Sequence, residues 1–156
     1  MKSNPYELSD KQSDKKAMAN EYFTWNEVYN TGIVTIDTQH KVILKILNEL
    51  YDVVFINKKD DKLAGILHEL VQYTIYHFEE EEKLFEKYHF IAEKEHKKEH
   101  ALFVEQISAF KQKLNTNDRL ITLELIDFLK NWLIDHILVK DQEYVKFFNA
   151  KGIQIN

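Results

Sequence analysis

The chain has 156 residues, of which 44% are hydrophobic and 30% charged, with a formal net charge of −5. This balance is typical of one globular domain and argues against a nucleic-acid-binding surface, which needs a basic face. The absence of cysteine excludes disulfides, zinc–thiolate sites and iron–sulfur clusters, so a bound metal must use histidine nitrogens and carboxylate oxygens.

Breaker residues are rare, with three glycines and one proline, which favours long helices over an all-β fold. No apolar run approaches the ~20 residues of a membrane span. No secretory apolar segment precedes Trp25 either. We therefore expect a cytoplasmic protein without membrane insertion.

Residues 1–20 are polar and contain the proline, which predicts a flexible leader ahead of a domain at 21–156, with a short accessory helix at Asp10–Ala19 as the alternative. Residues 21–38 mix aromatics with turn formers and predict an ordered arm without regular helix. Asp37 or Thr38 is expected to cap the first long helix. Four apolar side chains are expected to pin the arm to the domain: Trp25, Tyr29, Ile33 and Ile36.

Apolar residues spaced three and four apart predict four helices joined by short turns. The expected helices are Gln39–Ile56, Lys62–Tyr88, Ala92–Leu114 and Leu120–Phe148. Similar lengths and short connections predict an all-α, up-down-up-down four-helix bundle preceded by the arm.

Histidines occur on the apolar face of every predicted helix: His40, His77, His96 with His100, and His136. A lone histidine in an apolar seam, such as His40, is more often a hydrogen-bonded core residue than a metal ligand. Paired spacing is more informative, because residues four apart lie one turn apart on the same face. His77 shares its face with Glu81, and His96 with His100.

The helical phase directs Glu81 inward, whereas Glu79 and Glu82 point away. A buried carboxylate without a partner is costly, so Glu81 requires a cation. Asp141 follows His136 by five residues, about 140° around an ideal helix, so this pair converges only if both flank the interior. Five imidazoles and two carboxylates suit two bridged metal ions in the bundle core. Iron, manganese and zinc all accept such ligands.

The chain resembles the hemerythrin family, and more closely its bacterial single-domain members, from about Trp25 onward. Four segments carry the resemblance: WNEVYNTGIVTIDTQH, HFEEEEKLF, HKKEHALF and NWLIDHILVKDQEY. Each piece is weak, but the combined pattern of H, HxxxE, HxxxH and HxxxxD is specific. The resemblance implies a non-haem di-iron centre with an oxo or hydroxo bridge.

By the same resemblance, one iron is bound by three histidines and the other by two, which leaves the second iron one ligand short. The implied ligands are His96, His100 and His136 on one iron, His40 and His77 on the other, and Glu81 and Asp141 as bridges. Four side chains are expected to line an apolar pocket there: Leu133, Ile137, Trp132 and Phe78. Tyr144, three residues after Asp141, is either a donor that orients a ligand or an ordinary core residue.

These features predict reversible dioxygen binding for storage, transport or delivery, by a monomer that turns over no substrate. Its partners are expected to be dioxygen and a protein that receives it. The alternatives are a sensor of oxygen, redox state or NO, and a di-iron oxidase or peroxidase. Iron storage is disfavoured because it needs a large cage that one bundle of this size does not form.

Overall fold

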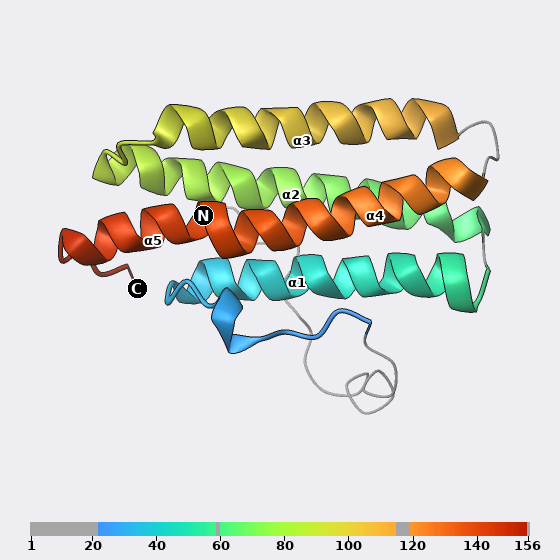
Figure 1. The fold of residues 1–156 in the computed structure, drawn as a ribbon, viewed down its shortest axis with the longest axis horizontal. Helices are drawn as coiled ribbons and strands as arrows, with labels where there is room; N and C mark the ends of the chain where they lie inside the picture. The colour runs from blue at the N-terminus through green and yellow to red at the C-terminus, as the bar shows by residue number, and fades with distance from the viewer. Residues whose placement is uncertain (1–21, 59, 115–118, 156) are drawn as a thin grey trace, which may run out of the picture.

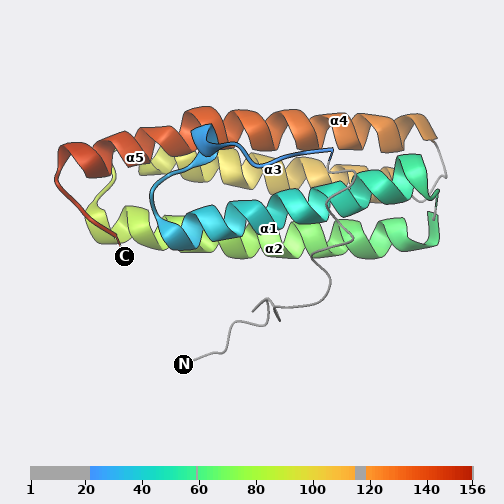
Figure 2. The ribbon, with the colours of Figure 1, turned by 90° about the horizontal axis from the view of Figure 1, so that it is seen from below.

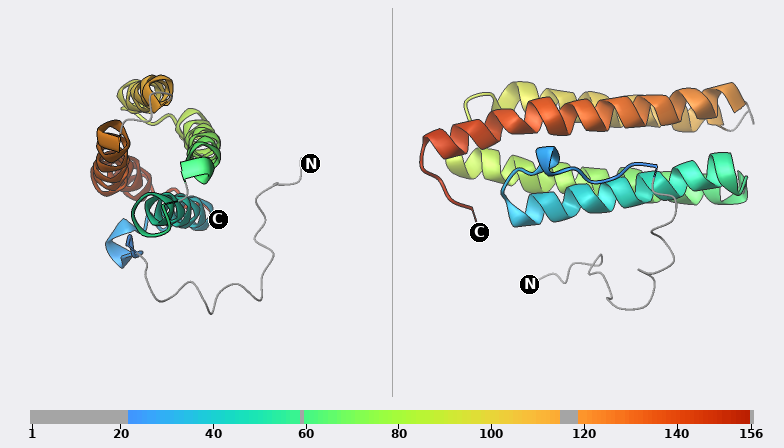
Figure 3. Two further views of the ribbon diagram at one scale, coloured as in Figure 1. Left: turned by 90° about the vertical axis from the view of Figure 1, so that its right-hand side faces the viewer. Right: turned by 60° about the horizontal axis from the view of Figure 1, so that its bottom comes forward.

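The computed structural model describes residues 22–58, 60–114 and 119–155. All regular structure in these ranges is helical, and four rods lie side by side with alternating direction (Figures 1 and 3). The rods are α1 (Val34–Tyr51), α2 (Asp60–Tyr88), α3 (Glu93–Leu114) and a composite of α4 (Arg119–Asp135), η3 (His136–Lys140) and α5 (Asp141–Ala150). The predicted all-α four-helix bundle is confirmed.

The first helix begins earlier than expected, at Val34 instead of Gln39. Asp37 lies inside its first turn and accepts hydrogen bonds from the Thr31 N–H at 2.7 Å, the Thr31 hydroxyl at 2.9 Å and the Gly32 N–H at 3.2 Å. The prediction that Asp37 or Thr38 caps this helix was therefore wrong. The Asp37 carboxylate instead binds the preceding loop, and its charge is favourable near a helix N-terminus.

The arm before α1 runs along the outside of the bundle (Figure 2). It is anchored at two levels. The Phe23 N–H donates to Asn48 Oδ1 at 2.7 Å, and Asn48 Nδ2 donates back to the Phe23 carbonyl at 2.8 Å. Further along, the short 3-10 turn η1 (Glu27–Tyr29) contacts η3. Phe23 and Ile33 are buried, so the arm covers part of the bundle.

The predicted last helix, Leu120–Phe148, is interrupted by one turn of π-helix, η3, between α4 and α5. A second π turn, η2 (Asp52–Ile56), ends the first rod. Such turns close with an i→i+5 hydrogen bond and are common at functional sites. In η3 this bond runs from the Asp141 N–H to the His136 carbonyl.

Two apolar clusters fill the bundle, and a polar layer separates them. The longer cluster contains Ile43, Leu70, Phe103 and Leu133, and the shorter one, near the α5 end, contains Ile36, Phe85, Tyr144 and Phe148. On α1, His40 lies between Ile36 and Ile43.

Among the described residues, no helix combines the length and apolar character that a membrane crossing requires. The expected leader and the turn at 115–118 lie outside the described residues.

Candidate metal centre

Every rod contributes to one buried polar cluster at the layer between the apolar clusters. Its seven members are His40 from α1, His77 and Glu81 from α2, His96 and His100 from α3, His136 from η3, and Asp141 from the start of α5. Each is at most 4% exposed. Their donor atoms form two overlapping groups able to hold a metal ion: Glu81, His96, His100 and His136, and His40, His77, Glu81 and Asp141. All seven residues that the sequence singled out as ligands are thus brought together.

Glu81 belongs to both groups, one oxygen facing each. Its Oε1 lies 3.6 Å from His77 Nε2, and its Oε2 lies 3.3 Å from His100 Nε2 and 3.9 Å from His96 Nε2. This is the arrangement of a carboxylate that bridges two cations.

Asp141 spans the same two groups from the opposite rod. Its Oδ2 lies 3.1 Å from His40 Nε2, and its Oδ1 lies 3.1 Å from His136 Nε2 and 3.2 Å from His96 Nε2. Two carboxylates therefore face both halves of the cluster.

The hydrogen-bonding state of these atoms tests whether cations fit. Glu81 Oε2 and both Asp141 carboxylate oxygens are buried without a hydrogen-bond partner. His136 Nε2 lies 3.1 Å from the Nε2 atoms of both His96 and His100, and His40 Nε2 lies 3.1 Å from that of His77. Buried carboxylate oxygens without donors are costly unless a cation pairs with them. The donor set therefore fits a pair of metal ions.

Two histidines are held from behind by residues that the sequence interpretation missed. Gln39 Oε1 lies 2.8 Å from His77 Nδ1, and Glu82 Oε1 lies 2.9 Å from His100 Nδ1. The expectation that Glu82 points away from the site was wrong. Glu82 lies on the side of α2 that faces α3, and its carboxylate reaches Nδ1 of the His100 ring. Such partners fix the ring and its tautomer, which leaves Nε2 for a metal.

A third carboxylate approaches the back of His136. Glu99 Oε2 lies 3.4 Å from His136 Nδ1, and Glu99 Oε1 pairs with Lys140 at 3.0 Å. Because Lys140 belongs to η3, this ion pair also ties the π turn to α3.

Tyr144 is fully buried, and its hydroxyl donates to Glu81 Oε1 at 2.7 Å. Burial, reinforced by the charges of Glu81 and Asp141, raises the pKa of Tyr144 well above its ordinary value. The phenol thus stays protonated and is a fixed donor to the carboxylate. Tyr144 also packs on Phe85 in the shorter apolar cluster.

The pKa shifts of His77, His100 and Asp141 favour metal binding, whereas the shift of His136 favours its protonated form while no metal is bound. Burial lowers the pKa of His77 and of His100 to about 3, so both are neutral imidazoles near pH 7. Burial opposes the charge on Asp141, but its imidazole neighbours, His136 first, hold its pKa well below the ordinary value. Burial also opposes protonation of His136, yet the Asp141 carboxylate raises the pKa of His136. Neutral imidazoles and ionised carboxylates are the forms that bind metals.

Two aromatic rings pack against the histidines on the side of the longer apolar cluster. Phe78 stacks on His100 with centroids 3.7 Å apart and planes 5° apart. Trp132 stacks on His136 at 4.4 Å and 11°. Leu133 and Ile137, on either side of His136 in the sequence, are 3% and 4% exposed. The four residues expected to line a pocket therefore all lie in the bundle interior or against a site histidine.

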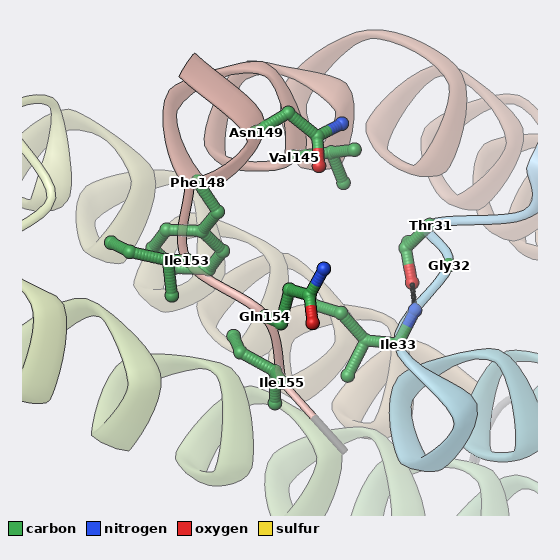
Figure 4. A pocket seen from close by; sticks show the side chains of 9 residues that line it. All are labelled: Thr31, Gly32, Ile33, Val145, Phe148, Asn149, Ile153, Gln154 and Ile155. Atoms are coloured by element: carbon green, nitrogen blue, oxygen red, sulfur yellow. Dashed lines mark hydrogen bonds between the residues drawn. The ribbon is translucent and has the colours of Figure 1, made fainter. Parts of the chain in front are cut away.

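Two further histidines and one cavity lie apart from this cluster. His68 and His89 are exposed, and His89 adopts a φ of 53° where α2 ends. A cavity of about 250 Å³ lies between the chain before α1 and the C-terminal tail, lined by residues that include Ile33, Phe148 and Gln154 (Figure 4). It contains none of the seven clustered residues.

The fold and the cluster define a class: a helical bundle with a buried histidine–carboxylate site for a pair of metal ions. A family model described as the hemerythrin HHE cation binding domain matches residues 31–148. The chain belongs to the hemerythrin family.

Individual relatives agree with that assignment. A bacteriohemerythrin of Pseudomonas aeruginosa is 36% identical over 124 residues, which cover 80% of each chain. One of Clostridium acetobutylicum is 32% identical over 127 residues, or 79% of this chain and 98% of the relative. A crystal structure of a hemerythrin mutant matches with a TM-score of 0.70 and 25% identity, over 81% of this chain and 97% of that one.

Proposed function

We propose that this protein binds dioxygen reversibly at a pair of iron ions and turns over no substrate. The observation that carries the proposal is the placement of the two carboxylates. Glu81 and Asp141 each direct one oxygen to either half of a fully buried imidazole cluster. Membership of the hemerythrin family makes iron the metal of choice among those that accept these ligands.

The proposed ligands follow the two groups of donors. One iron would be held by His96, His100 and His136 and the other by His40 and His77, with Glu81 and Asp141 shared between them. The second iron would have one imidazole fewer, and this unequal division would leave room for a small ligand there.

When bound, a ferrous pair supplies the two electrons that reversible dioxygen binding requires. The protein's part is to hold the ligands and exclude water. Tyr144 fixes Glu81, Glu82 and Gln39 fix two imidazoles, and apolar side chains including Leu133 and Ile137 close the interior beside His136. Both buried carboxylates of the cluster, Glu81 and Asp141, serve as proposed bridges. Because neither is left over to act as a general acid or base, the arrangement favours binding over acid–base turnover.

An optical titration tests the proposal. The purified protein is assayed for iron, reduced without air, exposed to oxygen and then deoxygenated. We expect two irons per chain and a visible charge-transfer band that appears with oxygen and disappears on its removal. A band that forms once and does not reverse would contradict oxygen carriage and favour a sensor or an oxidase. A protein that binds no iron would contradict the metal assignment.

A further inference from the structure

One buried hydroxyl stands out from the core. Among the described residues, the buried side-chain polar atoms without a hydrogen-bond partner all belong to the proposed iron ligands, with the exception of Thr74 Oγ1. Thr74 is 0% exposed. Helical threonines commonly satisfy their hydroxyl on a carbonyl in the preceding turn, as Thr38 does on the Val34 carbonyl at 2.7 Å. The Thr74 hydroxyl makes no such bond.

The position of Thr74 on α2 relates it directly to the metal cluster. Thr74 lies seven residues before Glu81, which is about 20° short of two full helical turns. It therefore lies on the face of α2 that presents Glu81 to the centre of the cluster. His77 follows Thr74 by three residues, within one turn.

The bundle places Thr74 in an otherwise apolar layer. α4 runs parallel to α2, whereas α1 and α3 run antiparallel to both (Figure 1). The residues level with Thr74 are therefore Ile43, three after His40, Phe103, three after His100, and Leu133, three before His136. These three are 1%, 1% and 3% exposed and belong to one apolar cluster. Of the four residues in this layer, which lies next to the imidazoles, Thr74 is the one with a hydroxyl group.

An unpaired buried hydroxyl is unfavourable, and valine would fill nearly the same volume without that cost. The feature is explained if the partner of the hydroxyl is a bound molecule. Any such molecule must be small, because the surrounding side chains are large and fully buried.

We propose that Thr74 is a ligand-binding residue whose hydroxyl donates a hydrogen bond to dioxygen, or to a small anion such as azide, held beside His77. This inference rests on the proposed two-iron site. Thr74 is then a polar side chain in contact with the ligand, in a pocket that apolar side chains otherwise line. The contact should slow ligand release and favour ligands with an acceptor atom over carbon monoxide, which is a poor acceptor.

The test compares Thr74→Val, which removes the hydroxyl, with Thr74→Ser, which keeps it, and uses Thr38→Val as a control on the exposed side of α1. Three quantities are measured: iron content, azide affinity of the oxidised protein, and the denaturant midpoint of the metal-free protein. We expect Thr74→Val to retain both irons, to unfold at an equal or higher midpoint, and to bind azide about fivefold to tenfold more weakly. Thr74→Ser and Thr38→Val should keep the azide affinity of the unsubstituted protein.

Unchanged azide affinity in a stabilised Thr74→Val protein would overturn the inference, because Thr74 would then be a core residue only. Equal losses in the valine and serine variants would also overturn it, since side-chain volume and not the hydroxyl would matter. Azide binding without reversible oxygen binding in the unsubstituted protein would remove the oxygen-carrier function alone. Absence of iron from that protein would remove both proposals.

Discussion

The backbone N–H of Asp141 donates to the carbonyl oxygen of His136, five residues earlier. In an ideal α-helix these side chains would lie about 140° apart. The wider π turn brings Asp141 Oδ1 to 3.1 Å from His136 Nε2. The five-residue spacing is thus converted into one shared face, and the turn belongs to the construction of the metal site.

Replacing Asp141 with alanine should cost the protein at least one of the two proposed irons. The variant loses a carboxylate that faces both halves of the cluster, while the remaining imidazoles cannot supply the missing negative charge. Iron is counted after gel filtration, beside Asp135→Ala, which removes an exposed carboxylate from the same rod. Two tightly bound irons in the Asp141 variant would refute its role as a bridge.

Much of this site follows from helical phase alone. Histidines at the apolar seam and the inward direction of Glu81 are consequences of the 3.6-residue period, so the sequence was enough to predict the bundle and the residues that converge in it. The start of α1 was missed because Gly32 and the β-branched residues after it are weak helix formers. The helix forms there because Asp37 binds Thr31 and Gly32. The periodicity of apolar residues does not predict a contact of this kind.

Helical periodicity did not predict the π turn or the hydrogen-bond partners of His77 and His100, which only the structure shows. A five-residue spacing is compatible with an α-helix whose side chains diverge, and only packing decides otherwise. Glu82 was assigned to the surface because its neighbour Glu81 occupies the inward direction. A glutamate side chain at the boundary between two helices is long enough to reach His100 on the next rod. Gln39, adjacent to His40, reaches His77 in the same way.

Replacing Glu82 with glutamine should weaken iron binding by about 10-fold to 100-fold, the usual effect of disturbing a residue that orients a metal ligand. The carboxylate fixes the His100 tautomer and increases its basicity, whereas an amide can turn either end toward the ring. Competition with a chelator gives the affinity. Glu86→Gln, which alters a surface ion pair with Lys97, is the matched control and should leave iron affinity unchanged. Equal affinities in both variants would leave Glu82 without this role.

Replacing Leu133 with alanine should speed autoxidation of the oxygen-loaded protein. Leu133 lies three residues before His136 and closes the interior beside it, so its truncation admits water. Leu129→Ala separates this effect from general loosening, because Leu129 is equally buried but one turn further away. Both variants should lose about 2–5 kcal/mol of unfolding free energy, but Leu133→Ala alone should autoxidise faster. An unchanged rate would remove Leu133 from the pocket.

The stability of the metal-free protein should fall as the pH drops below about 6.5. His77 and His100 have folded-state pKa values lowered to about 3, so the unfolded chain binds more protons between the folded and unfolded values. Unfolding is then favoured by acid, by up to about 1.4 kcal/mol per pH unit for each imidazole. His136, whose pKa is raised, acts in the opposite sense: its contribution is complete below about pH 6.5 and is lost only at higher pH.

Between about pH 4.5 and 6 the two lowered imidazoles favour unfolding, whereas Glu49, whose pKa is raised by burial, opposes them. Denaturant unfolding of the metal-free protein across that window gives the slope of unfolding free energy against pH, and His77→Gln should reduce the slope by the share of one imidazole. A slope that His77→Gln leaves unaltered would mean that His77 is not held neutral in the folded chain. Added metal should steepen acid sensitivity further, because protons and metal ions compete for the same Nε2 atoms.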